Sequence, residues 1–188
     1  MTWRLIECDV PHSSPGRVYV CINGVLYYFD RGASNVDDMI ICFDLRSEKF
    51  SFVKSMERGM RFETLINFQG KLASVRSLES FVVSGTSRSF EMWILEDPEK
   101  HEWSKRIFNL PPLWTDAAPR KILYFVGVND TNEFVFKPFC SSEPFYVHYY
   151  NFVNKAIKRV EIQGMGAFEK ASGVRIFLNH VEDVKLMQ

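Results

Sequence analysis

The chain has 188 residues, a length that can bury a sizeable apolar core. Aromatic residues make up 15% of it and include 17 phenylalanines, so the composition excludes a largely disordered chain. Its 23 Lys and Arg balance 23 Asp and Glu. A chain without net charge has no broad positive field to attract nucleic acids or anionic membranes. We therefore expect neither a nucleic acid nor a membrane as a partner.

The predicted elements are short β-strands rich in β-branched and aromatic residues, without a lasting 3.6-residue periodicity. In chain order, the strand candidates are residues 3–6, 23–29, 40–44, 70–75, 92–97, 122–128, 132–136 and 147–151. Residues 67–70 and 129–132 are rich in turn formers and are predicted to connect neighbouring strands.

Three hairpins repeat one pattern along the chain. In each of them an apolar strand ends on Asp or Asn, and a large apolar residue returns six positions later. The pairs are Asp44 and Phe50, Asp97 and Trp103, and Asn151 and Ile157. Asp and Asn tolerate turn conformations and accept hydrogen bonds from nearby backbone N–H groups, so we expect a polar turn followed by a returning strand. The repeats are 53 and 54 residues apart.

This period predicts the fold class. Units of about 50 residues with three or four short strands are typical of propeller blades and are close to the kelch repeat length. We expect an all-β, partial, kelch-like β-propeller of about three to four antiparallel blades. Residues 3–6 are interpreted as the closing strand of a unit, so a single domain over residues 1–188 is expected to start partway through a blade.

The chain carries no recognisable catalytic, cofactor or metal motif. Its four histidines lack the i, i+4 spacing of a zinc pair, and no phosphate-binding loop or nucleophile elbow occurs. Adjacent strand residues point to opposite faces, so Glu96–Asp97 and Glu182–Asp183 are each interpreted as a turn residue and a surface charge. His148 is expected to line a strand face, and His101 to lie in a solvated turn. We predict no catalytic residue, no cofactor and no bound metal, and hence not an enzyme.

The cysteines and the first residues of the chain indicate the cellular compartment. The four cysteines Cys8, Cys21, Cys42 and Cys140 are widely spaced. Cys21 and Cys42 lie in apolar runs, so we expect small buried thiols in a reducing compartment, with a disulfide or zinc framework as the alternative. No run approaches the roughly 18 apolar residues of a membrane span, and residues 1–7 lack the layout of a secretory signal. We predict a location in the cytoplasm or nucleus.

Aromatic residues offer the candidates for contact with a partner. Consecutive prolines in residues 110–115 favour an extended, exposed backbone, which makes Trp114 the candidate contact residue. Packing of Trp114 inside the fold is the alternative. The pairs Tyr27–Tyr28, Tyr149–Tyr150 and Trp93/Trp103 are interpreted as core, with a binding face as the alternative.

Ordered strings over essentially the whole chain carry a family resemblance. They are residues 21–28, 43–50, 65–73, 92–97, 101–104, 110–114, 145–151 and 178–184. Together they resemble the F-box-associated domain of plant F-box proteins, the type-3, β-propeller-like variety. The resemblance implies a role in Skp–cullin–F-box ubiquitin ligases, where this domain captures the protein to be ubiquitinated. The helical F-box that docks on the Skp adaptor is not present in this sequence, and the family supplies no substrate-contacting residues to carry over.

Three hypotheses on function remain open at this stage. The first is a protein-interaction module that recognises an unknown protein substrate and reaches the Skp adaptor only through an F-box absent from this chain. The second is a propeller-type enzyme or glycan-binding module whose site is assembled from blade-edge loops. The third is a truncated product that has no ligase role or that competes with full-length relatives.

Overall fold

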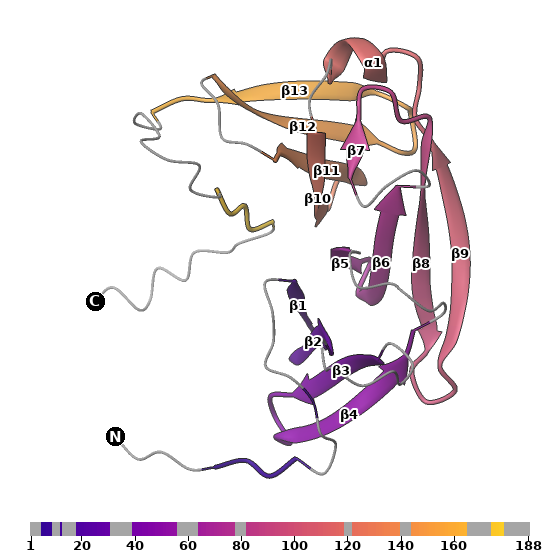
Figure 1. The fold of residues 1–188 in the computed structure, drawn as a ribbon, viewed down its shortest axis with the longest axis vertical. Coiled ribbons are helices and arrows are strands. Elements are labelled where there is room, and N and C mark those ends of the chain that lie inside the picture. Colours follow the sequence, from indigo (N-terminus) through magenta and orange to yellow (C-terminus); the bar gives the residue numbers. More distant parts are fainter. Residues whose placement is uncertain are drawn as a thin grey trace. The chain divides into compact units, whose positions relative to one another are not determined.

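The computed structural model describes residues 5–8, 12, 18–30, 39–55, 64–77, 82–118, 122–139, 144–164 and 174–178. These residues form three antiparallel β-sheets and one four-residue helix (Figure 1). The predicted all-β class is confirmed. The chain divides into two compact units, and we call them unit 1 (Met1–Phe81 with Ser89–Phe108) and unit 2 (Val82–Arg88 with Asn109–Gln188).

The first sheet lies in unit 1 and follows chain order. It consists of β1 (Tyr19–Ile22), β2 (Val25–Phe29), β3 (Met39–Asp44) and β4 (Lys49–Lys54). Asn23 and Gly24 have φ values of 51° and 82° and form the two-residue turn between β1 and β2. The predicted strand over residues 23–29 therefore begins two residues too early, because Asn and Gly readily adopt the left-handed backbone that this turn requires.

The second sheet also lies in unit 1. Its strands are β5 (Thr64–Phe68), β6 (Lys71–Ser77), β8 (Ser89–Asp97) and β9 (Glu102–Asn109), hydrogen-bonded in that order. The predicted turn at residues 67–70 is confirmed, with Gln69 and Gly70 at positive φ. In Figure 1, β8 and β9 run side by side, and β9 is the last strand of this sheet.

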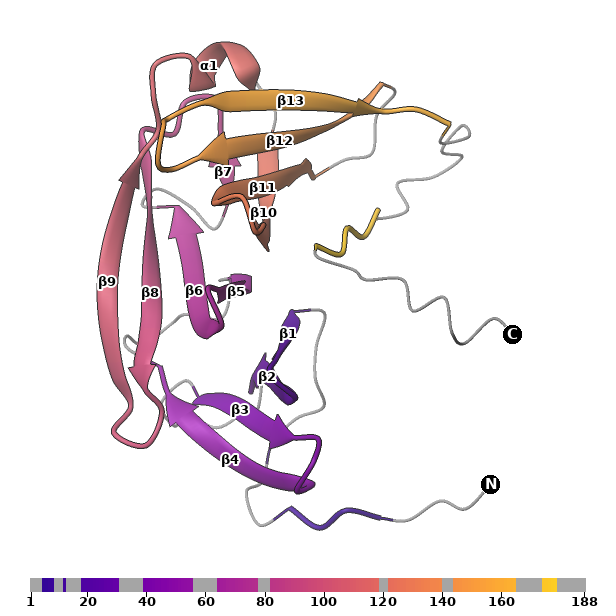
Figure 2. The same ribbon diagram turned by 180° about the vertical axis from the view of Figure 1, so that it is seen from behind.

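The third sheet and the helix belong to unit 2. The strands are β7 (Val83–Ser84), β10 (Ile122–Val128), β11 (Glu133–Pro138), β12 (Phe145–Asn151) and β13 (Ile157–Ile162). They are hydrogen-bonded in the order β13-β12-β11-β10-β7, and the helix α1 (Trp114–Ala117) lies beside β13 (Figure 2). The hairpin predicted between residues 122–128 and 132–136 is confirmed. Neither β7 nor α1 was predicted.

The three predicted hairpins are confirmed, and a turn of the same kind connects the two strands of each. Oδ1 of Asp44 accepts hydrogen bonds from the backbone N–H groups of Arg46 and Ser47, at 2.9 and 2.7 Å. Asp97 and Asn151 each accept hydrogen bonds from the N–H groups two and three residues later, at 3.0 to 3.1 Å. The fourth residue after each has positive φ, and these residues are Glu48, His101 and Lys155. The six-residue spacing thus reflects a four-residue turn with a left-handed last position.

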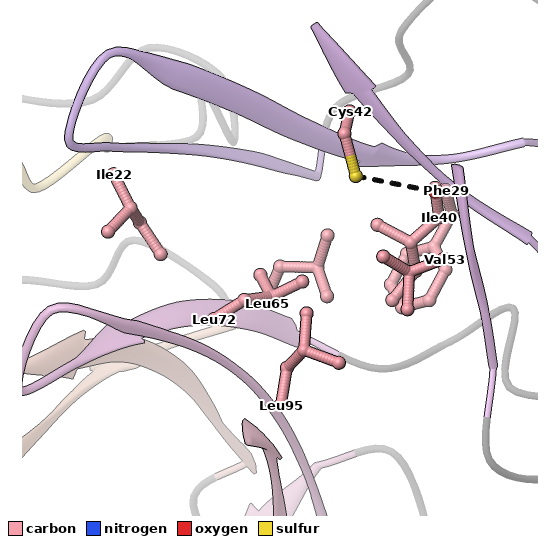
Figure 3. Close-up of a cluster of buried hydrophobic side chains, with 8 residues drawn as sticks. All are labelled: Ile22, Phe29, Ile40, Cys42, Val53, Leu65, Leu72 and Leu95. Carbon is pink, nitrogen blue, oxygen red and sulfur yellow. Dashed lines mark hydrogen bonds between the residues drawn. The ribbon is translucent and has the colours of Figure 1, made fainter. Parts of the chain in front are cut away.

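The core of unit 1 forms where the first two sheets meet. Ile22, Phe29, Ile40, Cys42 and Val53 of the first sheet face Leu65, Leu72 and Leu95 of the second (Figure 3). Burial of these apolar side chains from both sheets supplies the main stabilisation. In unit 2, Phe134 and Phe136 of β11 pack with Phe125 of β10, at ring-centroid distances of 6.4 and 4.9 Å.

Two sequence-based expectations concern the start of the chain. Residues 3 and 4 lie outside the described residues, while Leu5 and Ile6 are exposed and not in a strand, so the closing strand predicted at residues 3–6 is not found there. The single domain and the start partway through a blade stay predictions. Within the described ranges, no helix has the length and apolarity to cross a membrane.

Candidate interaction surface

Trp114 lies inside unit 2. Its side chain is only 1% exposed, and its Nε1 donates a hydrogen bond to the carbonyl oxygen of Ser84 at 2.8 Å. Its ring packs against Phe136 with the centroids 5.1 Å apart. The expected extended backbone is wrong here, because the chain turns after Pro111 and Pro112 into α1. The structure therefore favours the alternative of packing inside the fold for Trp114.

The paired aromatic residues divide between core and surface. Tyr28 and Tyr150 are fully buried, as the core interpretation expects. Trp103 packs against the core of unit 1, and its Nε1 donates to the carbonyl oxygen of Lys54 at 3.0 Å. Trp93 is half-buried, and the Lys105 ammonium lies over its ring, 4.9 Å from the centroid. Trp93 is thus one aromatic residue of unit 1 with an accessible part.

A mixed charged and apolar surface surrounds Trp93 on the second sheet. We define the Trp93 face by Arg76, Glu91, Trp93, Lys105 and Ile107. Arg76 and Glu91 are directly opposite each other in the β6–β8 ladder, so both side chains lie on one face. Lys105 contacts Trp93 and Glu91, and the alternation of β9 places Ile107 beside it, 57% exposed. This face therefore combines a cation, an indole and an exposed aliphatic side chain.

The charge of the Trp93 face is set by Glu91. Its side chain is 1% exposed and its carboxylate pairs with Arg76 and, at 2.5 Å, with the ammonium of Lys105. Burial by itself would raise the pKa of Glu91, but hydrogen bonds from Lys105 and Arg76 outweigh burial and hold this pKa below its usual value. Two partly exposed cations against one buried carboxylate leave a local positive charge, which would complement an acidic segment of a partner.

The sequence did not single out this face. Arg76 lies beyond the predicted strand 70–75, and Glu91 lies before the predicted strand 92–97, because β6 and β8 each extend further than their apolar runs. The alternation Trp103-Ser104-Lys105-Arg106-Ile107 was an available signal for one face of β9. The contact of Arg76 with Glu91 depends on the strand register, which the apolar pattern left undetermined.

The cysteines lie in different environments. Cys42 is buried, and burial raises its pKa from 9.0 to about 11, although a hydrogen bond with Ser51 lowers it. The expectation of a buried thiol is wrong for Cys21, which is exposed at the edge strand β1. Cys21 and Cys42 are free thiols, Sγ of Cys8 lies 3.5 Å from Nδ1 of His12, and Cys140 lies outside the described residues.

The histidines and acidic pairs occupy structural positions. His148 is buried on β12, where its Nε2 lies 3.0 Å from the carbonyl oxygen of Ala117, as expected for a strand face. His101 lies in the predicted turn, but its ring stacks on Phe52 and is half-buried rather than fully solvated. The Glu96 carboxylate accepts hydrogen bonds from Lys71 and Ser104, and the Asp97 carboxylate accepts one from the backbone N–H of Glu99 in the turn. Residues 180, 182 and 183 lie outside the described part, within which no three His, Cys, Asp or Glu side chains gather as a metal site.

Comparison with known proteins gives a whole-chain match. A family model for an F-box associated beta propeller domain matches residues 1–181, in agreement with the predicted fold class. The F-box protein DOR of Arabidopsis thaliana is 48% identical over 190 residues, covering 100% of this chain and 47% of the relative. The F-box protein At5g65850 of the same plant is 46% identical over 190 residues, covering 100% of this chain and 48% of the relative. The chain therefore spans about half the length of these relatives.

Proposed function

Because the chain belongs to the F-box associated β-propeller domain family, we propose that it recognises a substrate protein for a Skp–cullin–F-box ubiquitin ligase. The observation that carries this proposal is the family match over residues 1–181 together with relatives named F-box proteins. This membership supports an adaptor role over the enzyme and glycan-binding alternatives. The Skp adaptor would be reached through an F-box, and the substrate through this domain.

The Trp93 face is the surface that we assign to substrate contact. Tryptophan and arginine are enriched among interface residues that dominate binding energy, and both occur there with an exposed isoleucine. The side chains project from hydrogen-bonded strands, so little conformational freedom is lost when a partner binds. The positive charge of Arg76 and Lys105 favours a substrate segment that carries Asp or Glu beside an apolar residue.

The remaining sequence-based expectations enter the proposal unchanged. We propose one kelch-like propeller domain over residues 1–188, with no cofactor and with neither nucleic acid nor membrane as a partner. Free thiols at Cys21 and Cys42 support a reducing compartment, either cytoplasm or nucleus.

A chimera tests the proposed function. The part of F-box protein DOR that this chain does not match is joined to the N-terminus of the chain, and the product is used to capture proteins from plant extract. We expect the Skp adaptor, a cullin and a reproducible set of further proteins, and we expect these further proteins to gain ubiquitin when ligase components and ATP are added. Mass spectrometry measures both the capture and the modification.

The matched control is the same chimera with Ile107→Asp. Ile107 is 57% exposed, so the fold should persist while the exposed apolar side chain of the Trp93 face is replaced by a negative charge. This control should retain the adaptor and cullin but lose the further proteins. If the unmodified chimera captures nothing beyond what the DOR part captures alone, the proposed function is wrong.

A further inference from the structure

Residues Val174–Leu178 form an extended strap in unit 2, drawn in yellow in Figure 2. The exposure of its side chains alternates: Val174, Ile176 and Leu178 are half-buried, whereas Arg175 and Phe177 are exposed. Phe177 is 70% exposed. This period of two is that of an extended chain with one face against a surface. The strap therefore directs three aliphatic side chains inward.

The surface under the strap is an apolar part of the third sheet. Val174, Ile176 and Leu178 pack against Val135 of β11 and against Phe145 and Val147 of β12, all three of which are nearly fully buried. The Lys137 ammonium donates a hydrogen bond to the carbonyl oxygen of Val174. We call Val135, Phe145, Val147, Lys137 and the neighbouring Gly127 the strap face.

The strap is attached differently from the strands. It belongs to none of the hydrogen-bonded strand orders, and among the described residues it makes no backbone-to-backbone hydrogen bond. Within the described residues, side-chain packing and a hydrogen bond from Lys137 hold the strap on the sheet. Segments held without ladder hydrogen bonds open at a lower free-energy cost than the strands beneath them.

Gly127 provides the space for the last inward side chain. A Cβ atom at this position would lie 2.9 Å from Cδ1 of Leu178, which is closer than such contacts occur. The β10–β11 register shifts between Phe125 and Gly127, so the bulge lies at the same place. The strap face is thus shaped to receive an aliphatic side chain at the position of Leu178.

We propose that the strap face is a binding surface for an extended partner segment with aliphatic residues at three alternate positions, and that the strap is its displaceable internal occupant. The proposal rests on the proposed function, since the partner segment would belong to the captured protein. Removal of the strap alone would expose Val135, Phe145 and Val147 to water, so only a segment that covers them again can replace it. Because the strap is part of the same chain and competes for the same surface, it also lowers the apparent affinity of the strap face for a free peptide.

Peptide binding to the full chain tests this proposal. The probe is a fluorescein-labelled peptide with the sequence of residues 172–179, and fluorescence anisotropy reports its binding. Ile176→Ser and Leu178→Ser each weaken the inward packing of the strap and leave the strap face unaltered. We expect both variants to bind the peptide about tenfold more tightly than the unmodified chain. Phe177→Ser, which changes an outward side chain, is the matched control and should bind like the unmodified chain.

The peptide itself supplies a second comparison. Serine at the three inward positions should abolish binding to the Ile176→Ser variant, whereas serine at the two outward positions should leave it unchanged. The proposal is overturned if neither folded variant binds the peptide better than the unmodified chain, or if inward and outward replacements have equal effects. Unfolding of both variants, seen by circular dichroism, would also overturn it, because the strap would then be a permanent part of the core. No ligase component takes part, so a failure here and a failure of the chimera are separate results.

Discussion

At Asn151, one side-chain oxygen holds the turn of the third repeated hairpin. Oδ1 accepts hydrogen bonds from the N–H groups of Val153 and Asn154, and Nδ2 donates to the carbonyl oxygen of Thr131. Asn151→Ala removes all three, whereas Asn151→Asp keeps the acceptor. We expect the alanine variant to be less stable than the aspartate variant by about 1 kcal/mol. Urea unfolding measures the difference, and equal stabilities would show that the acceptor is not needed.

Cys42 and Cys21 should differ in reactivity. Only the thiolate reacts with iodoacetamide, and burial raises the pKa of Cys42 to about 11, so at pH 8 roughly one thiol in a thousand is ionised. Cys21 is exposed on β1 and accessible to the reagent. We expect peptide mapping by mass spectrometry to find Cys21 alkylated and Cys42 unmodified in the folded protein. Denaturation in urea should remove this protection, and alkylation of Cys42 in the folded state would contradict the packing shown in Figure 3.

At the scale of elements, α1 depends on one side chain. Trp114 is buried against Phe136 and bonded to Ser84, so it fixes the helix to both β7 and β11. Trp114→Ala should lower the free energy of unfolding by about 3 kcal/mol, because a large buried ring is lost. Trp114→Phe keeps most of the packing and removes the indole hydrogen bond to the Ser84 carbonyl, which keeps its hydrogen bond from the N–H of Ser87, so a loss of about 1 kcal/mol is expected.

The neighbour Leu113 provides the control for this prediction. It is 68% exposed, and Leu113→Ser should change the thermal midpoint little. If Leu113→Ser proves as destabilising as Trp114→Ala, the packing of this loop differs from the structure.

The elements that the sequence predicted are those with local causes. Each repeated hairpin is encoded within about fifteen residues by an apolar run, an Asp or Asn, and a returning apolar residue. β7 has two residues and exists only through its pairing with β10, far along the chain, so no local pattern could predict it. α1 has four residues, too few for a helical period, and it follows two prolines that favoured an extended chain.

The candidate surface was less predictable for a similar reason. Arg76, Glu91 and Lys105 come from three strands, and they meet only because the register aligns them. The sequence indicates two possible roles for Trp93, core or binding face, but it does not show which cation lies beside the ring. Conversely, the two prolines predict an exposed Trp114, but the chain turns after them and buries this side chain.

At the scale of the molecule, the carboxylates with a lowered pKa in the described part of the chain all belong to unit 1. They are Asp44, Glu91, Glu96 and Asp97. Hydrogen bonds lower each pKa: backbone and side-chain donors of Ser47 act on Asp44, those of Lys100 act on Asp97, and Lys71 acts on Glu96. Their ordinary values are 3.8 for Asp and 4.5 for Glu, so each group binds protons more readily in the unfolded chain than in the folded one. Their stabilising contribution is therefore complete above these values and is lost as the pH falls below them.

Acid should consequently unfold unit 1 before it disturbs the hairpins of unit 2. We expect a thermal midpoint that is nearly constant between pH 7 and about pH 5 and that falls below about pH 4.5. Hydrogen exchange at low pH should show β8 and β9 losing protection ahead of β12 and β13. Glu91→Gln serves as the control: it leaves Arg76 and Lys105 without their carboxylate, so it should cost about 2 kcal/mol at pH 7 and make the remaining acid dependence shallower. An equally steep acid transition in Glu91→Gln, or loss of protection first in β12 and β13, would contradict this assignment, because the titrating groups would then lie elsewhere.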